Sequence, residues 1–252
     1  MKANQRLKSW LVCIDDTDDI GTKGTGEIAQ ELAVLLSPDQ RLSRCSFVTR
    51  HQLFVHPDIP YTSHNSAMCF QIRSLLSENA IIDIAKAHLT RESAPAADPG
   101  FALLDLQADI DHQRLIDFGL QAKREVKNKS QAYELAQSLG VHLSEHGGTG
   151  QGVIGAIAGL GLRLQGNDGR IKGQFKLRGL DQGGVYLSVA DVVEQTGVDR
   201  VLTDAGESLC IKTPLLLSGK VKAVYRDHQV SLLVYQQDGV WRNALKQHLK
   251  HY

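Results

Sequence analysis

WLVCIDDTDDIGTKGTGE, residues 10–27, joins a short apolar run to four closely spaced aspartates and a glycine-rich loop. The run from Trp10 to Ile14 carries β-branched residues and ends in turn residues, which predicts a buried strand. From Thr25 the chain continues TGEIAQELAVLLS, whose apolar residues recur at helical spacing. The predicted order is therefore strand, acidic loop and helix. It places the aspartates at the carboxyl end of a strand, where α/β sheets bind ligands.

The acidic loop holds Asp15, Asp16, Asp18 and Asp19 within five positions. Carboxylates this close repel one another and raise each other's pKa, and a hard metal ion relieves the repulsion. Magnesium prefers oxygen ligands, usually one or two carboxylates together with waters and substrate phosphates. The loop therefore predicts a magnesium site, against the alternative of a solvated acidic turn that caps a helix.

Three glycines follow the aspartates, at Gly21, Gly24 and Gly26. Glycine lets backbone amides converge on an anion, and the helix start behind them carries a partial positive charge. Carboxylates for a metal and amides for phosphates together predict a polyphosphate site, such as one for ATP. No GKS or GKT follows the glycines, so this is not a Walker loop. An alternative is an aspartyl phosphatase in which Asp16 is the covalent nucleophile.

A second glycine run, HGGTGQGVIGAIAGLGLRL, begins at His146. Gly150, Gly152 and Gly155 have the spacing of a dinucleotide fingerprint, with Asp168 near the position of a ribose-binding acid. That fingerprint needs a strand directly before it, whereas the preceding QAYELAQSLG has a helical pattern. The alternative is a glycine-faced helix over 153–160 that packs closely on a sheet or starts at a phosphate, and the sequence favours it.

The segment HLSEH, with His142, Glu145 and His146, matches the inverted zinc-protease pattern. Two histidines four residues apart share one helix face. However, the two glycines that follow end any helix at once, so there is little room for both ligands. Histidines in a loop or at the surface are the favoured interpretation.

The remaining pattern predicts an α/β (α+β) protein with a boundary near residue 164. The expected elements are strands over 45–55 and 67–72, helices over 78–90 and between 111 and 139, and a linker at 94–100. Beyond the boundary, residues 170–178 alternate apolar and basic like a half-exposed strand, and 221–225 with 230–235 form a hairpin. Trp241, Leu245 and Leu249 predict a closing helix. The predicted domains are 1–164 and a smaller α+β domain, 165–252.

Composition describes an ordinary globular protein of 252 residues with 42% apolar residues and 28 basic against 28 acidic side chains. Because basic and acidic side chains balance, the chain lacks the net positive charge that is typical of nucleic-acid-binding proteins. The four cysteines are scattered without a CxxC pair, which indicates reduced thiols in a cytoplasmic protein rather than a zinc ribbon. The sequence shows neither a signal peptide nor the apolar run of about 20 residues that a membrane helix needs.

Three of these stretches, in the same order, resemble the archaeal agmatinylcytidine synthetase family that modifies isoleucine tRNA. CIDDTDDIGTKGTGEIA resembles the start of that family, PDIPYTSHNSAMCF its second motif, and GQGVIGAIAGLG its third. The resemblance covers about residues 11–164. It implies a mixed-sheet, kinase-like first domain that uses ATP to phosphorylate the C2 oxygen of a cytosine, after which agmatine displaces the phosphate. It also implies a ferredoxin-like second domain that helps to bind agmatine.

The resemblance assigns roles to individual residues of this sequence. It implies that Thr25 is a self-phosphorylated threonine and that Asn65 lies in a loop facing the substrate. It implies magnesium ligands at Asp15, Asp16 and Asp18, with Asp16 and Asp18 also catalytic. It also implies that Gly150, Gly152 and Gly155 complete the nucleotide site. Gly24 and Gly26 are added to that site by the glycine pattern itself.

The sequence departs from the family in two respects. Gly24 and Gly26 stand where the family has a cysteine and a second threonine. The oligonucleotide-binding and zinc-ribbon domains that recruit tRNA have no counterpart, so we do not expect a tRNA partner. The leading hypothesis is an ATP- and magnesium-dependent phosphoryl-transfer enzyme or ligase that activates an oxygen of a small molecule or nucleoside for attack by an amine. Alternatives are the phosphatase and a non-catalytic nucleotide or polyamine sensor, and a homo-oligomer is left open.

Overall fold

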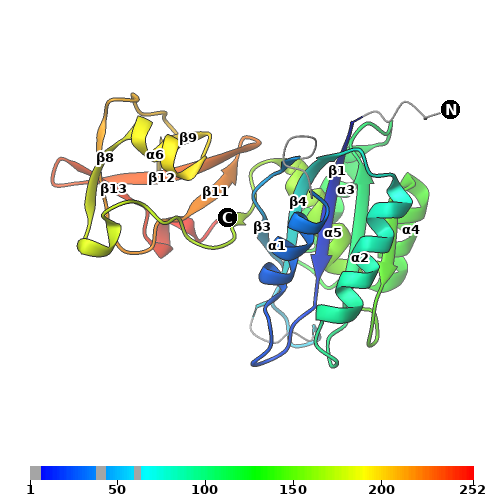
Figure 1. The fold of residues 1–252 in the computed structure, drawn as a ribbon. Helices are drawn as coiled ribbons and strands as arrows, with labels where there is room; N and C mark the ends of the chain where they lie inside the picture. The colour runs from blue at the N-terminus through cyan, green and yellow to red at the C-terminus, as the bar shows by residue number, and fades with distance from the viewer. Residues whose placement is uncertain (1–6, 38–43, 60–63) are drawn as a thin grey trace. The chain divides into compact units, whose positions relative to one another are not determined.

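The structure, a computed structural model, describes residues 7–37, 44–59 and 64–252, with only the backbone of Gln182. The chain divides into two compact units, Met1–Gln165 and Gly166–Tyr252. Each unit contains both strands and helices and is considered by itself (Figure 1).

Unit 1 is built on a sheet whose central strand is the predicted strand at the start of the chain. The strand order is β6 (His142–Glu145), β5 (Gly100–Asp105), β1 (Lys8–Asp15), β4 (Ser66–Ser74) and β3 (Thr49–Gln52), with β2 (Arg44–Cys45) also on β4. Each of these neighbouring pairs is antiparallel. The strand predicted over 67–72 is confirmed, whereas the one predicted over 45–55 is two short strands.

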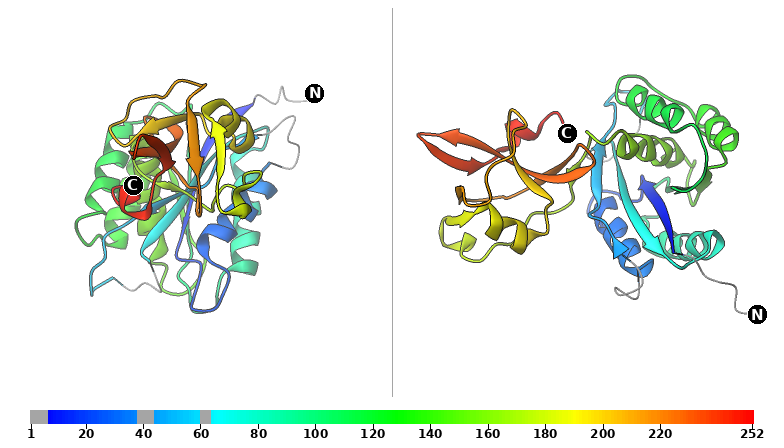
Figure 2. Two further views of the ribbon diagram at one scale, coloured as in Figure 1. Left: turned by 90° about the vertical axis from the view of Figure 1, so that its left-hand side faces the viewer. Right: turned by 90° about the horizontal axis from the view of Figure 1, so that it is seen from above.

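Helices cover both faces of this sheet (Figure 2). One face carries α1 (Thr25–Leu35) and α2 (Glu78–Glu92), and the other carries α3 (His112–Gln121), α4 (Lys129–Leu139) and α5 (Gly152–Gln165). Successive side chains of β1 alternate between the two layers: Val12 packs toward α1 and α2, and Cys13 toward α5. Because both faces of β1 are buried, each large apolar side chain contributes about 1.5–3 kcal/mol. The strand therefore holds the residues at its end rigidly.

The second glycine run forms a helix pressed closely against the sheet. A Cβ at Gly159 of α5 would lie 3.0 Å from the Cβ of Ala67 on β4, and one at Gly161 would lie 2.5 Å from the backbone of Leu115 on α3. The glycine-faced helix is thus confirmed, and it is longer than predicted. The dinucleotide interpretation needs a parallel βαβ unit, whereas β6, the strand before α5, is antiparallel to its neighbour β5.

Unit 2 is a strand-rich α+β unit. Its strands follow the order β7 (Arg170–Ile171), β11 (Ala223–Arg226), β12 (Gln229–Gln237), β13 (Val240–Asn243), β10 (Pro214–Leu217) and β8 (Val185–Ser188), with β9 (Arg200–Thr203) parallel to β12. Helix α6 (Val189–Thr196) and the 3-10 helices η1 (Leu180–Gln182) and η2 (Lys246–Leu249) join them. The predicted hairpin is confirmed as β11–β12. The expected α/β (α+β) class is confirmed as well.

Two predictions in unit 2 are wrong, for local backbone reasons. The closing helix is absent from residues 240–243, because Asp238 and Gly239, with φ of 51° and 76°, turn the chain back and place Trp241 on β13. The strand predicted over 170–178 ends at Ile171, and Gly173 has a φ of +93° that breaks the extended conformation. Residues 174–181 instead line a hollow of about 490 Å³.

Within residues 7–37, 44–59 and 64–252, no helix has the length and apolar character needed to cross a bilayer.

Candidate functional site

The acidic loop begins where β1 ends. Asp15 is the last residue of the strand and is 8% exposed, and Asp16 has a φ of 53°, which turns the chain sharply out of the sheet. The carbonyl of the buried Thr17 accepts a hydrogen bond of 2.9 Å from the backbone of Ala94. The side chain of Thr25 at the start of α1 donates to Asp18 Oδ1 at 2.7 Å. The loop is thereby tied to both α1 and the segment after α2.

The carboxylates of this loop disfavour each other's charge. Burial, followed by the charge of Asp16, raises the pKa of Asp15 well above its usual range. Burial, followed by the charges of Asp98 and Asp18, raises the pKa of Asp16 to about 6. These shifts are those expected where several carboxylates share one site without a cation.

Asp98 is a member of the site that the sequence analysis missed, because it lies in the segment interpreted as a linker. Its backbone N–H donates to the Asp16 carboxylate, which partly offsets the repulsion between the two charges. Its own carboxylate accepts hydrogen bonds from the backbone N–H and the hydroxyl of Thr149. Asp98 therefore connects the acidic loop to the second glycine run. The only sequence signal for it is an aspartate before Pro-Gly ahead of a strand.

The glycines of the second run allow this close assembly. A Cβ at Gly155 would lie 2.6 Å from Cγ of Asp15, and one at Gly152 would lie 2.9 Å from the Asp15 carbonyl oxygen. Gly150 has a φ of +73° and lies against the Glu145 side chain. The structure thus brings Gly152 and Gly155 onto Asp15. Gly150 lies beside them in the turn that Thr149 ties to Asp98.

Two helix N-termini consequently lie at the end of β1. Helix α1 begins at Thr25, beside Asp18, and helix α5 begins at Gly152, whose N–H donates to the Asp98 carbonyl at 3.0 Å. The two helices belong to opposite faces of the sheet. Helix N-termini attract anions through their unpaired N–H groups and the helix dipole. The arrangement offers positive ends for phosphates next to carboxylates for a cation.

The first turn of α1 holds three of the predicted residues. Gly24 is the N-cap, with φ of −70° and no side-chain cap, and Thr25 and Gly26 are buried behind it. The Thr25 hydroxyl also accepts from the Thr17 N–H at 3.4 Å. Among the described residues, the Thr17 hydroxyl has no hydrogen-bond partner. A second hydroxyl is therefore buried in the acidic loop with its hydrogen-bonding capacity unused.

Asn65 lies at the same end of the sheet as the acidic loop. Its side chain is engaged in a hydrogen bond within the protein. It immediately precedes β4, whose Met68 pairs with Ile14 one residue before Asp15. Its Nδ2 donates to the Phe54 carbonyl at 2.6 Å and closes the loop that leads to β4. Part of the predicted second motif, residues 60–63, lies outside the described residues.

The zinc pattern HLSEH forms the strand β6 and the residue that follows it, so successive side chains point to opposite faces. His142 and His146 both hydrogen-bond Ser144, at 3.0 and 2.9 Å, and both rings lie near Phe101. Glu145 instead accepts from Lys129 at 2.6 Å and from Tyr133 of α4 at 3.1 Å. The carboxylate and the two imidazoles therefore do not converge.

The residues at the end of β1 have the chemistry to hold magnesium and a phosphate group. The donors are oxygens of Asp15, Asp16 and Asp18, the set that magnesium prefers, and their mutual repulsion is what a cation removes. The N-termini of α1 and α5 beside them present the positive ends of two helix dipoles to an anion.

Comparisons with known proteins identify the fold. No protein-family model and no curated protein matches the chain. The crystal structure of a tRNA fluorescent labeling enzyme matches 61% of this chain and 36% of its own, with a TM-score of 0.52 and 23% identity. A complex of TiaS with tRNA and ATP matches 71% of this chain and 42% of its own (TM-score 0.53, 19% identity). A complex of TiaS with tRNA, AMPCPP and agmatine matches 74% and 44% (TM-score 0.52, 18% identity).

TiaS is a tRNA agmatidine synthetase, and the present chain spans 36–44% of the length of these three matched chains. At identities of 18–23% the likeness establishes the fold. The expected resemblance to the agmatinylcytidine synthetases is thus confirmed as a shared fold.

Proposed function

We propose that this protein is an ATP- and magnesium-dependent phosphoryl-transfer enzyme or ligase that activates an oxygen of a small molecule or nucleoside. The observation that carries the proposal is the meeting of two helix N-termini with an aspartate cluster at the end of β1. Catalysis of phosphoryl transfer depends mainly on positioning and on neutralising charge, and this arrangement is suited to both.

The aspartates would hold the metal. Asp16 and Asp18 lie in the loop itself, and Asp15 lies behind them against Gly155. Magnesium, when bound there, would supply positive charge to phosphate oxygens. The backbone at Gly24 and Gly26 would bind the phosphates from the start of α1. The N–H groups of Gly150 and Gly152 already donate to carbonyls, so the start of α5 would contribute the positive end of its helix dipole.

Thr25 is proposed as a phosphoryl acceptor. Its hydroxyl donates to Asp18 at 2.7 Å, so Asp18 is placed to take the proton when the Thr25 oxygen attacks. This role rests on the family resemblance and on that contact. Gly24 and Gly26, on either side of Thr25, stand where the family has larger residues.

The acceptor and the nucleophile are proposed by analogy with the ligands of the matched structures. One matched TiaS structure contains agmatine and an ATP analogue. We propose an amine of that class as the second substrate, and we propose that Asn65 faces the acceptor. The net charge of zero and 6% aromatic residues favour a small acceptor over tRNA.

Calorimetry with ATP tests the proposal. We expect wild-type protein to bind ATP only with magnesium, and Asp16→Asn to weaken that binding at least tenfold. Asp109→Asn, at an exposed aspartate outside the site, is the matched control and should bind like wild type. Absence of ATP binding to wild type, or equal binding by Asp16→Asn, would refute the proposal.

Mass spectrometry after incubation with ATP and magnesium locates the phosphoryl group. A stable phosphoester on Thr25 supports the assignment of the acceptor. A hydroxylamine-sensitive acyl phosphate on Asp16 would instead support the aspartyl phosphatase.

A further inference from the structure

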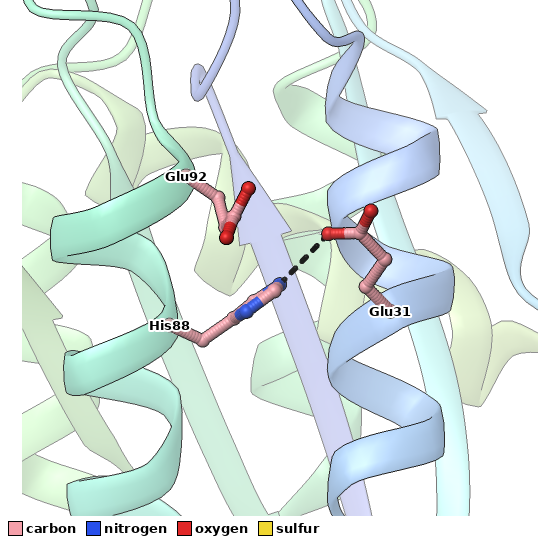
Figure 3. A group of neighbouring side chains, drawn as sticks. All are labelled: Glu31, His88 and Glu92. Carbon is pink, nitrogen blue, oxygen red and sulfur yellow. Dashed lines mark ion pairs between the residues drawn. The ribbon is translucent and has the colours of Figure 1, made fainter.

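A group of ionisable side chains lies between α1 and α2, beside the acidic loop rather than in it (Figure 3). Glu31 comes from α1, and His88 and Glu92 come from one face of α2, four residues apart. One ligand atom from each lies within 4.8 Å of the others. His88 is 2% exposed, whereas the two glutamates are partly exposed. Two carboxylates this close to each other require a cation.

Lys23 supplies that cation from the glycine loop. Its Nζ lies 2.8 and 3.0 Å from the two carboxylate oxygens of Glu31 and 2.6 Å from Glu92 Oε2. Hydrogen bonds from Lys23, and then from Arg91, lower the pKa of Glu92 to about 2, and the Glu31 hydrogen bond raises the pKa of Lys23. Glu92 is therefore charged at neutral pH, and both carboxylates are paired with the Lys23 ammonium. The protein's own ammonium occupies the position that a metal ion would take.

His88 makes this pairing site rigid. Its Nε2 lies 3.2 Å from the carbonyl of Ile28 on α1, and its Nδ1 lies 3.1 Å from Arg91 Nη2. Because the arginine must donate, Nδ1 accepts and Nε2–H donates to the carbonyl. The buried imidazole thus links α2 to α1, and its Nε2 also lies 3.6 Å from Glu31 Oε2 (Figure 3). Glu31 and Glu92 are consequently held at a fixed separation.

The segment that Lys23 anchors has few other attachments. Residues 19–22 form a turn closed by the Thr22 hydroxyl, which accepts from the Asp19 N–H at 2.8 Å and donates to its carbonyl at 2.9 Å. At the tip, Ile20 is 85% exposed and Gly21 has a φ of +82°. Lys23 is the next residue, directly before the N-cap Gly24. Its two ion pairs tie the loop to the helices at the point where the proposed phosphate site begins.

We infer that Lys23 is a positioning residue: paired with Glu31 and Glu92, it holds the glycine loop in the conformation that receives the phosphates of ATP. Lys23 acts through the loop backbone, since its ammonium is committed to the two glutamates. The inference rests on the proposed function, and it names a residue that this function does not otherwise use.

Hydrogen exchange of the ligand-free protein tests the anchor without reference to ATP. We expect Lys23→Met to speed amide exchange about tenfold over residues 19–24, because the ion pairs no longer restrain the loop. Lys23→Arg should restore slow exchange, since it keeps the charge. Lys8→Met, which removes an ion pair of 2.7 Å to Asp105 elsewhere, is the control. Unchanged exchange over β1 in all variants shows that they remain folded.

ATP kinetics then test the positioning role. Lys23→Met and Glu92→Gln should each raise the KM for ATP about tenfold while kcat changes less than about threefold, a split typical of lost ground-state binding. If the Lys23→Met variant has the same exchange rates and the same KM for ATP as the Lys8→Met variant, the inference is overturned. A different outcome is that Lys23→Met speeds exchange but even the wild-type protein does not bind ATP. That outcome would reject the proposed function and the positioning role, and it would show only that Lys23 holds the loop in place.

Discussion

Gly155 of α5 lies against the carboxylate of Asp15 so closely that a Cβ at position 155 would stand 2.6 Å from Asp15 Cγ and 3.0 Å from Leu53 Cδ1. The backbone of Gly155 is not left-handed, so the glycine is required by space and not by conformation. This contact lets the start of α5 reach the end of β1. It is therefore the contact on which the assembly of the site depends.

Substitution Gly155→Ala is expected to destabilise the protein. The added methyl group cannot be accommodated without moving either α5 or the buried Asp15, and overpacking of this kind costs about 1–3 kcal/mol in the free energy of unfolding. Chemical denaturation followed by circular dichroism measures it.

The control for this prediction is Gly24→Ser. Gly24 has a φ of −70°, and a Cβ there would lie 3.7 Å from Asp18 Oδ2, an ordinary contact. Serine at a helix N-cap is neutral or stabilising by a few tenths of a kcal/mol. Equal stability of the two variants would contradict the close approach of Gly155.

The fold was predictable wherever local pattern and burial agree. β1 and α1 were predicted because their apolar residues have the periods of a buried strand and of an amphipathic helix. The prediction of a closing helix was wrong although Trp241, Leu245 and Leu249 have helical spacing. The turn at Asp238 and Gly239 before them makes the chain fold back as a strand instead. That dipeptide is a hairpin signal, so the information was present in the sequence.

The candidate site was predictable only in its local parts. The aspartates and the glycines that follow them are contiguous in sequence, so their chemistry can be read directly. Asp98 is different, since its hydrogen bonds reach Thr149, 51 residues away. That contact exists because β5 and β6 are antiparallel neighbours, with Gly100 opposite Glu145. Strand order is set by long-range packing, and no local pattern near Asp98 encodes it.

Asp16→Asn is expected to remove a pH dependence of stability. Because the pKa of Asp16 is raised to about 6 in the folded protein, the unfolded chain loses its proton first as pH rises from about 4. The free energy of unfolding therefore falls between about pH 4 and pH 6 in the metal-free protein. Asparagine tolerates the φ of 53° and keeps an oxygen for the Asp98 N–H.

The measurement is the melting temperature across this pH range, with and without magnesium. At pH 7 without metal, Asp16→Asn should melt higher than wild type, and the two should converge near pH 4. Magnesium should raise the melting temperature of wild type alone, more at pH 7 than at pH 5. A variant that melts lower than wild type at pH 7 would show that the Asp16 charge is already compensated within the protein.

Asp98→Asn is expected to lower the pKa of Asp16 from about 6 toward its ordinary value, because the Asp98 charge is the largest electrostatic cause of the shift after burial. Carboxyl-carbon NMR of selectively labelled aspartate follows the titration. The Thr149 turn should loosen as well, since an amide nitrogen cannot accept one of the two hydrogen bonds. If the titration of Asp16 did not change, the charge of Asp98 would not act on Asp16, and Asp98 would not belong to the site.

Thr25→Val tests the hydroxyl at the start of α1. Valine has nearly the same shape but leaves the buried Thr17 N–H without its acceptor and Asp18 without a donor. An unsatisfied buried group costs about 1–3 kcal/mol, so the variant should unfold at lower denaturant concentration than wild type. Thr25→Ser keeps both hydrogen bonds and should retain most of the stability.

If Thr25 also accepts a phosphoryl group, the serine variant gains the same mass as wild type after incubation with ATP, and the valine variant gains none. Equal stability of the valine and serine variants would mean that the hydroxyl does not hold the acidic loop, and Asp18 would then have no fixed partner for the proton transfer.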